Sequence, residues 1–471
     1  MEVYMFNIFG RKKITQIQSN LAHLLSRYNV NDPSTPDLVI DAEIPKVGFL
    51  KYAVNEMTPT PFNTNEKRAV NCHISIGNCI ENVQKHLKSP IKNWSATSLL
   101  QVYPAAGADL NAFYDRRSLK FYYYNFKGKN VYFADSSDIV THELGHAMLD
   151  AMRPDFWSVQ ALEVWSFHEA FSDIVAMFNL MSYDVALNKM LVETKGDLSV
   201  SNSVSRLAEE VGILIRNVTR DPSYLPNALR DPAVEAFKYE DPARLPAETS
   251  NNKLAAECHS FGRVFSNAWY QIFVRIFKYH VSIGNNPTSA IRTARDFSFS
   301  ILAQAIPGSA RVVNYYASIA KSMIVVAKSK NPEYASIMKQ VFVEWRILNE
   351  SEVRTLSGPS WKDMVSQLKK NDIVVKNSKV TSVVIRNEAT LKASELPMVS
   401  SLSFKDDFEI EIPSDSYYEF DEKGRLSFEM KPSDEEIKSS AAICLNSIAK
   451  SIGKNGDWFV ENGRLVRQKI S

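Results

Sequence analysis

The alternation of hydrophobic and polar positions divides the chain into three parts. Residues 1–135 contain several short strand-like runs, and two aromatic runs on either side of Lys127-Gly128 predict a β-hairpin over 119–134. From 136 to 350 the hydrophobic spacing becomes helical, whereas 372–471 favours short strands and one helix. We therefore expect an α+β protein with a mixed N-terminal lobe, a helical lobe and a small α+β C-terminal domain.

Several elements have predictable limits. Ser136 or Ser137 is the expected N-cap of a helix that Pro154 ends, because a proline cannot continue a helix. Further helices are expected at 158–181, 261–280, 287–305, 309–328, 331–347 and 434–452, and strands at 373–375, 380–385 and 408–412. The stretch 217–252 holds five prolines and is expected to form an irregular rim of a cleft.

Composition and charge exclude several classes of protein. A length of 471 residues is too great for one compact core, and 45% hydrophobic residues is ordinary for a globular chain. The formal net charge of +2 gives no reason to expect binding to nucleic acid. No apolar run approaches the roughly 18 residues that a membrane-spanning helix requires, so membrane insertion is not expected.

The N-terminus and the cysteines bear on the location of the protein. Basic residues at 11–13 follow the first apolar stretch, which reverses the charge order of a secretory signal peptide. The four cysteines, Cys72, Cys79, Cys258 and Cys444, are widely spread, which favours free thiols in a reducing compartment. We expect a cytoplasmic protein, or one exported without an N-terminal signal peptide.

The segment 142–146 carries the strongest chemical signal. His142 and His146 are four residues apart, so on a helix both imidazoles face the same side and can bind one metal ion. Glu143 is rotated by about 100° from His142, where it flanks the metal and can act as a general base. This H-E-x-x-H pattern is typical of zinc metalloproteases. Taken alone, the two histidines could also be surface residues of an ordinary helix.

A catalytic zinc site needs a third protein ligand and an open position for water. Glu169 is the best candidate, because its distance along the chain allows a second helix to run back beside the first. Asp173, four residues later on the same face, is expected to accept a hydrogen bond from the ring of His142. Other assignments stay open: His168 as the ligand, a capping box of Ser166 and Glu169, or a solvated Asp173.

Four blocks, matching in their order along the chain, resemble segments of the thermolysin family of gluzincin metallopeptidases. Residues 137–147 are similar to its zinc helix, and 168–174 to the block Asn-Glu-Ala-x-Ser-Asp that supplies the third ligand. Asn111-Ala112-Phe113-Tyr114 resembles the family's edge strand, and 259–270 the block with its transition-state histidine. The resemblance spans roughly 60–348 and implies a two-lobed zincin fold, with the edge strand and zinc helix in a mixed first lobe.

The resemblance implies one Zn2+ ion per chain, bound by His142, His146 and Glu169. Glu143 would take a proton from the attacking water, and zinc would polarise the scissile carbonyl. His259 would stabilise the oxyanion of the tetrahedral intermediate.

Substrate contacts follow from the same resemblance. Asn111 and Ala112 would align a peptide along the edge strand. Arg230 would hold a substrate carbonyl, but Arg216 and Arg220 compete for this role, and a surface arginine is an equal alternative.

Three features depart from the family pattern. Only Glu257 is available as the acidic partner of His259, two residues ahead of it. Phe156 or Trp157 stands where the family has a tyrosine, so a donor to the oxyanion is lost. The acidic cluster that binds structural calcium has no counterpart at 179–184, so the family's calcium sites are expected to be absent.

Three functions fit this sequence. A zinc-dependent endopeptidase acting on a peptide or protein is the leading one. A gluzincin aminopeptidase would need an acidic anchor for a free amino terminus, and no segment like Gly-x-Met-Glu-Asn occurs. The alternative from another class is a non-catalytic binding or assembly protein that keeps the metallopeptidase scaffold. Residues 372–471 carry no readable motif and could bind a partner protein.

Overall fold

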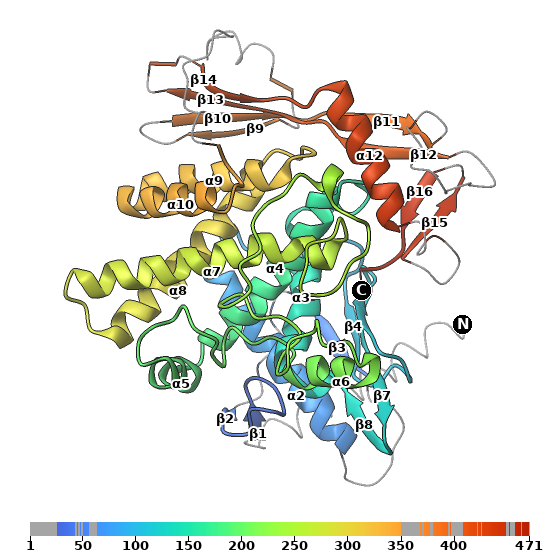
Figure 1. Cartoon of the computed structure of the whole chain (residues 1–471), viewed down its shortest axis with the longest axis vertical. Coiled ribbons are helices and arrows are strands. Elements are labelled where there is room, and N and C mark those ends of the chain that lie inside the picture. The colour runs from blue at the N-terminus through green and yellow to red at the C-terminus, as the bar shows by residue number, and fades with distance from the viewer. Residues whose placement is uncertain are drawn as a thin grey trace, which may run out of the picture.

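The computed structural model describes residues 26–349, apart from 43–44, 46–47, 49 and 56–63, and residues 368–470 with several short gaps. The basic residues at 11–13 and the expected domain boundary after residue 350 lie outside the described residues. Within the described part the protein is α+β. Helices occupy the centre, the C-terminal strands lie at one end, and the ribbons β1–β2 and β7–β8 lie at the other (Figure 1).

A four-stranded sheet in the N-terminal part has β5 as one of its edge strands. Its order is β3 (Tyr52–Val54), β4 (Leu100–Tyr103), β6 (Ser118–Phe121) and β5 (Ala112–Tyr114). β3, β4 and β6 are parallel, whereas β5 runs antiparallel to β6 and forms the edge. The two ribbons pair β1 (Ser26–Asn29) with β2 (Val39–Ala42) and β7 (Tyr123–Phe126) with β8 (Lys129–Tyr132). The predicted hairpin is thus present at β7–β8, and its first aromatic run is shared with β6.

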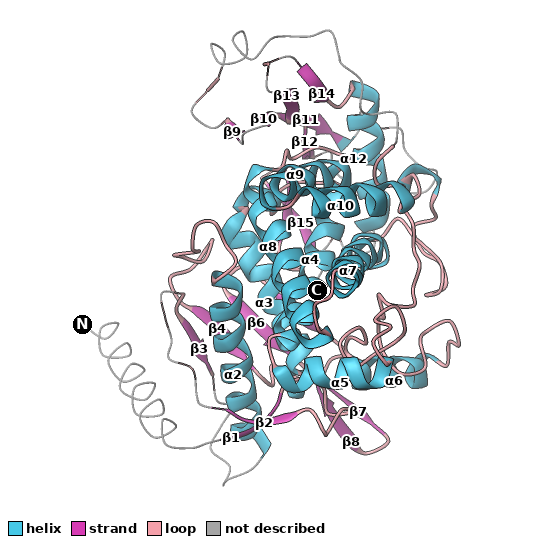
Figure 2. Cartoon of the chain, turned by 90° about the vertical axis from the view of Figure 1, so that its left-hand side faces the viewer, coloured by secondary structure: helices cyan, strands magenta, loops and turns pink. Residues whose placement is uncertain are grey.

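Three helices form the centre of the molecule: α3 (Ser137–Met152), α4 (Leu162–Met181) and α7 (Cys258–Ser282). Every residue of α4 is buried, because α4 packs against both α3 and α7 (Figure 2). Two glycines allow the close approach. A Cβ at Gly145 would lie 2.7 Å from the Cα of Ser172, and one at Gly262 would lie 2.9 Å from the Cβ of Glu169.

Further helices surround this centre. They are α2 (Thr64–Gln84), α5 (Asp184–Thr194), α6 (Glu209–Thr219), α8 (Pro287–Ala305), α9 (Tyr315–Lys330) and α10 (Pro332–Glu344). Helix α2 packs against α3 and α4, and α8 and α10 pack against α7. Residues 220–257 are irregular apart from one turn at Pro242–Arg244, as expected for a rim.

The apolar helix α4 also bears on membrane insertion. No single described helix is long and apolar enough to cross a membrane. α4 and α5 pass by length and composition only when taken together, with a bend of 96° between them, and α4 is wholly buried.

The C-terminal part contributes two four-stranded sheets and a helix. One sheet has the order β14 (Leu426–Met430), β13 (Ser416–Asp421), β10 (Val380–Ile385), β9 (Ile373–Lys376). The other has the order β11 (Glu388–Lys392), β12 (Glu409–Pro413), β16 (Arg464–Arg467), β15 (Trp458–Glu461), and α12 (Asp434–Ile448) packs on β12. Buried residues of this second sheet, such as Ile410 and Trp458, belong to the same hydrophobic core as the central helices.

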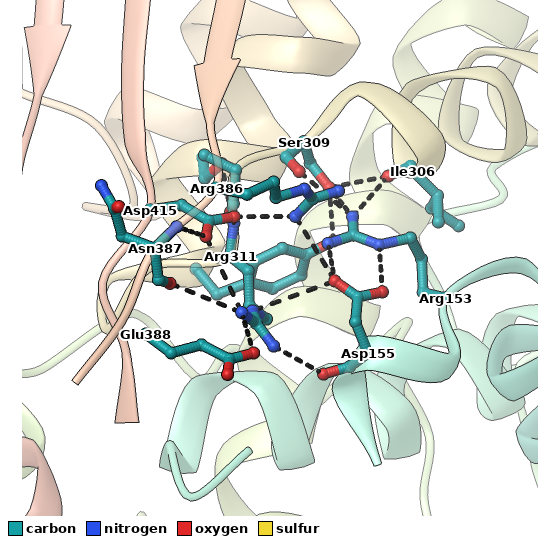
Figure 3. A network of polar contacts seen from close by, with 12 residues as sticks. Arg153, Asp155, Ile306, Ser309, Arg311, Arg386, Asn387, Glu388 and Asp415 are labelled. Atoms are coloured by element: carbon teal, nitrogen blue, oxygen red, sulfur yellow. Dashed lines mark hydrogen bonds and ion pairs between the residues drawn. The ribbon is translucent and has the colours of Figure 1, made fainter. Parts of the chain in front are cut away.

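A buried ionic network also joins the C-terminal strands to the helices (Figure 3). Asp415, which is fully buried, accepts hydrogen bonds from Nη1 of Arg386 and the backbone N–H of Arg311, each at 2.7 Å. Asp155 pairs with Arg386 at 3.3 Å and with Arg153 at 2.8 Å. The network therefore connects the end of α3 to the strands before and after Asp415.

The main differences from the expected elements are at helix starts. α4 begins at Leu162 and not at 158, because Gln160 is held in an extended pairing with Glu411, its N–H donating to the carbonyl at 2.9 Å. α9 begins at Tyr315 and not at 309, because Arg311 and Val312 pair with the segment 414–415. Within the described residues α12 spans Asp434–Ile448, and Ile452, the expected last residue of this helix, forms a bridge with Trp458 instead. The helices α2, α5 and α6 were not among those expected.

Candidate metal centre

Two neighbouring helices bring the sequence-predicted metal ligands together. α3 carries His142 and His146, and α4 carries Glu169. From the carboxylate oxygens of Glu169 to Nε2 the distance is 3.5 Å for His142 and 3.7 Å for His146. One ligand atom from each residue lies within 4.8 Å of the others, so this group could hold a metal ion.

The burial of Glu169 favours a cation at this point. Its side chain is 1% exposed, and neither carboxylate oxygen has a hydrogen-bond partner in the part of the chain that the structure describes. An ionised carboxylate is costly to bury unless it is paired or bound to a metal. A metal ion between Glu169 and the two imidazoles would remove that cost, so these residues fit such an ion.

Asp173 orients the first of the two imidazoles. Nδ1 of His142 lies 3.0 Å from Oδ1 of Asp173, and Nη1 of Arg230 donates to the same oxygen at 2.6 Å. A carboxylate on the outer ring nitrogen fixes the tautomer and turns the other nitrogen toward a metal. Nδ1 of His146, by contrast, has no hydrogen-bond partner among the described residues.

The charges around the imidazoles favour a positive charge at the centre. Burial alone would lower the pKa of His142, but the carboxylates of Asp173 and Glu169 raise it to about 9. Burial lowers the pKa of His146 well below its usual value, so this ring is neutral, which is the form that binds a metal. Burial opposes the ionisation of Glu169, yet the nearby histidines hold its pKa well below the usual range. A bound cation can take the place of the proton on His142.

Glu143 lies on α3 beside the ligands and lines the same pocket. It is buried, and its Oε2 has no hydrogen-bond partner within the described residues. Burial raises the pKa of this carboxyl to about 8, against the opposing effect of His142. A bound cation would act in the same direction as His142 and favour the ionised, basic form.

His259 approaches the centre from the first turn of α7. Its Nε2 lies 3.5 Å from Oε2 of Glu169, and its Nδ1 lies 2.7 Å from Oε1 of Glu257. Glu257 is the N-cap of α7 and also accepts from the backbone N–H of His259 and Ser260. Burial alone would lower the pKa of His259, but Glu169 and Glu257 help to hold it well above its usual value. The acidic residue two positions ahead is therefore in direct contact with the histidine.

A pocket with a volume of about 410 Å³ opens over these groups. Asn111 and Ala112, at the start of β5, line it together with Arg230. The rest of its wall is mainly apolar and comes from α3, α4, α6 and the loop at Leu229, including Ile139, Ala176, Val211 and Ile215. The structure thus brings all the sequence-predicted catalytic and substrate-binding residues to one cavity, beside the metal ligands.

Two alternatives for the third ligand fail on geometry. A capping box of Ser166 and Glu169 is wrong, because α4 begins at Leu162 and both residues lie in its interior. His168 lies outside the metal-binding groups found among the described residues. Its ring is buried, with its centroid 5.8 Å from that of His146.

Among the competing arginines, only Arg230 reaches the pocket. Its side chain is 13% exposed and pairs with Asp173. Arg216 donates to the carbonyl oxygens of Pro222 and Tyr224, and Arg220 is exposed. The alternative of a surface arginine at 230 is therefore wrong.

Neither Phe156 nor Trp157 gives a hydrogen-bond donor to this pocket. Phe156 has no polar atom and is fully buried. Nε1 of Trp157 donates to the carbonyl oxygen of Arg467 at 3.0 Å.

Sequence reasoning missed Cys258 as a neighbour of the site. Its Sγ forms a second group with ligand atoms of Glu169 and His259, all within 4.8 Å of one another. Burial raises the pKa of this thiol to about 12, so it stays protonated, whereas a metal ligand has to be a thiolate. In the sequence, its position next to His259 was the one feature that could have indicated this proximity.

The comparisons with known proteins leave the site to be understood from its own residues. No family model matches the chain, and no curated protein matches it. What the described residues establish is a buried group of two imidazoles and a carboxylate that could hold a metal ion.

Proposed function

We propose that this protein is a zinc-dependent endopeptidase. The convergence of His142, His146 and Glu169 beside a pocket that also contains Glu143 and His259 carries the proposal. It agrees with the resemblance to the thermolysin family, which implies a mixed lobe with the edge strand and zinc helix beside a helical lobe. The contacts of α3 with β5 and β6 on one side and with α4 on another support the same two-lobed arrangement.

Zinc is the metal that suits this ligand set best. Catalytic zinc sites combine three nitrogen or oxygen ligands from the protein with one open position, and the His2Glu set is one of the known combinations. Zinc bound there would lower the pKa of a coordinated water toward roughly 7 and polarise the carbonyl of the scissile bond.

The remaining steps belong to side chains of the pocket. Glu143 takes a proton from the attacking water and delivers it to the leaving amine, as general base and then general acid. Nε2 of His259, held by Glu257 on the other ring nitrogen, donates to the oxyanion that forms on the scissile carbonyl. Ala112 pairs with the peptide backbone, and Arg230 binds a substrate carbonyl.

The variant Glu143→Gln tests the role of the general base. The amide keeps the size of the side chain but cannot accept the water proton. Peptide cleavage by the zinc-loaded protein should fall by about 100-fold or more, the usual contribution of a general base. Zinc content, measured by elemental analysis, should not change. Cleavage at the wild-type rate would remove Glu143 from the mechanism.

Glu169→Ala is the matched control for metal binding. It removes a ligand but leaves Glu143 in place, so both zinc and activity should be lost. Equal zinc content in this variant and the wild type would contradict the ligand assignment.

A non-catalytic binding protein is the second candidate, because neither Phe156 nor Trp157 supplies a donor to the pocket. A wild-type protein that binds one zinc ion per chain and cleaves no peptide would support this candidate instead.

A further inference from the structure

The outer edge of β5 is where a peptide could pair with this protein. In an antiparallel ladder, successive residues point their N–H and C=O groups alternately toward and away from the neighbouring strand. Phe113 pairs with Lys120 of β6, and the N–H of Tyr122 donates to the carbonyl of Asn111. The backbone groups of Ala112 and Tyr114 therefore face away from β6.

The chain's own C-terminal segment occupies the second of these two positions. The N–H of Tyr114 donates to the carbonyl of Ile470 at 2.9 Å, and the N–H of Ile470 donates to the carbonyl of Tyr114 at 2.8 Å. The pairing is antiparallel, and the ammonium of Lys469 lies 4.6 Å from the ring centre of Phe113. We call residues 464–470 the tail; Figure 1 shows the chain leaving β16 and returning to the sheet that contains β4.

The tail is packed into the core of the molecule. Ile470 is 1% exposed and belongs to the main hydrophobic core. The guanidinium of Arg467 lies between 5.4 and 5.8 Å from the ring centres of three tryptophans, Trp157, Trp165 and Trp458. The hydrogen bond from Trp157 to the carbonyl of Arg467 holds the backbone as well. These contacts hold the tail in place beside β5.

The position of the tail relative to the metal group determines which part of a bound peptide it blocks. Asn111 and Ala112 line the pocket with His142 and Glu143, so the Tyr114 end of β5 lies on the side away from the candidate centre. A peptide that pairs antiparallel to β5, as the tail does, runs from Tyr114 toward Asn111. Its residues opposite Tyr114 would therefore precede the scissile bond.

We propose that the tail ends the peptide-binding edge of β5 at Ala112, so that substrates carry only a short segment on the N-terminal side of the scissile bond. A backbone group that is already paired within the protein cannot also pair with an added strand. The substrates would be peptides cut within about one or two residues of their amino end, blocked or free, with no such limit on the C-terminal side. This inference rests on the proposed peptidase function and narrows its substrate class.

A series of peptides tests the inference. All share one scissile bond and one C-terminal half, and they carry one, two, three or four residues before the bond, each with an acetylated amino end. For the zinc-loaded wild type, kcat/KM should stay level or fall beyond two residues. A continuous rise in kcat/KM up to four residues would overturn the inference.

The variant Ile470→Pro opens the blocked edge, because proline has no N–H to donate to Tyr114. In this variant kcat/KM should rise by roughly tenfold between two and four residues, as expected for about two added backbone hydrogen bonds. The matched control is Arg464→Ala, which removes an exposed side chain of the tail that pairs with Glu409 and not with β5. Its length profile should equal that of the wild type, and a rise equal to that of Ile470→Pro would contradict a role for the Tyr114 pairing.

Amide hydrogen exchange on the wild type gives a readout that does not depend on cleavage or on the folding of a variant. The amides of Tyr114 and Ile470 should exchange slowly both without peptide and with the longest peptide. Fast exchange at Ile470, in the free protein or after the peptide is added, would show an open edge and overturn the inference. A protein that binds zinc but cleaves no peptide would refute the proposed function, and exchange at Ile470 would still decide whether the tail holds the edge.

Discussion

Two carboxylates on α4 show how the same degree of burial leads to opposite protonation. Glu169 faces three histidines, and its pKa lies well below the usual range. Glu163, also buried, accepts hydrogen bonds from the backbone N–H of Tyr316 at 2.7 Å and the hydroxyl of Tyr239 at 2.8 Å. Burial dominates there and raises the pKa of Glu163 to about 7. Glu169 is therefore ionised and can bind a cation, whereas Glu163 favours the protonated form.

This difference predicts how stability depends on pH. Because the pKa of Glu163 is higher in the folded protein than its ordinary value of 4.5, its contribution to stability is complete below pH 4.5 and is lost as the pH rises to about 7. In Glu163→Gln the amide oxygen can still accept from the backbone N–H of Tyr316, the amide N–H can donate to the hydroxyl oxygen of Tyr239, and the side chain has no acidic proton to lose. The free energy of unfolding of the variant minus that of the wild type should therefore be larger at pH 8 than at pH 5. Urea unfolding at both values checks this, and an equal difference at the two pH values would contradict it.

Sequence reasoning at the residue scale succeeded where chemistry fixes the spacing within one helix. His142 and His146 have to be four residues apart to face one ion, and Glu169 and Asp173 share a face in the same way. Cys258 and Ile470 could not be found by that route. Their places beside the site come from packing between segments that are far apart in the chain, which leaves no spacing to recognise.

At the scale of elements, the site depends on how closely α3, α4 and α7 approach. Gly145 lies between the two histidines of α3 and faces Ser172 of α4, and Gly262 of α7 faces Glu169. A larger residue at either position would push apart the helices that carry the ligands. The glycines thus serve the metal group through the distances between helices.

Gly145→Ala tests this dependence. In an ordinary exposed helix the change from glycine to alanine would stabilise the protein by about 1 kcal/mol. Here the added Cβ would meet the backbone of Ser172 at 2.7 Å, so we expect a loss of about 1–3 kcal/mol of stability and weaker zinc binding. Urea unfolding and competition with a zinc chelator measure the two effects. A variant as stable as the wild type, with unchanged zinc affinity, would show that the helices do not need this contact.

Hydrophobic periodicity predicted the central helices but placed the starts of α4 and α9 too early. Hydrophobic periodicity indicates which face of a helix is buried. It does not indicate whether the residues before the helix form backbone hydrogen bonds with another segment. At Gln160 and at Arg311 and Val312 the backbone pairs with the segment 411–415, so it stays extended. Competition from a distant strand is a tertiary effect, and the local sequence does not contain it.

At the scale of the whole molecule, the C-terminal part is joined to the helices by buried charge as well as by apolar packing. Asp415 accepts from Arg386, from the backbone of Arg311 and, at 3.0 Å, from the backbone N–H of Asn387. The sequence predicted three strands of this part, at 373–375, 380–385 and 408–412, and its helix, but not β11, β13 or β14. It could not place them against the helices, because the partners Asp155 and Asp415 are ordinary acidic residues with no motif around them.

Asp415→Ala should therefore destabilise the whole protein. Removing one partner of a buried ion pair leaves an uncompensated charge and costs about 3–5 kcal/mol. The matched control is Glu388→Ala, which removes a half-exposed partner of Arg311 at 2.6 Å and should cost about 1 kcal/mol or less. Urea unfolding compares the two variants. Equal losses in the free energy of unfolding would show that the burial of Asp415 does not increase its contribution to stability.

The pairing of Tyr114 with Ile470 has a consequence for the order in which the protein is made. Ribosomes release a chain from its amino end, so β5 and all three candidate ligands emerge long before residues 464–470. A nascent chain can complete the ligand group while the sheet edge beside it is still bare. Selectivity for short amino-terminal segments would then be acquired only when translation has reached the tail.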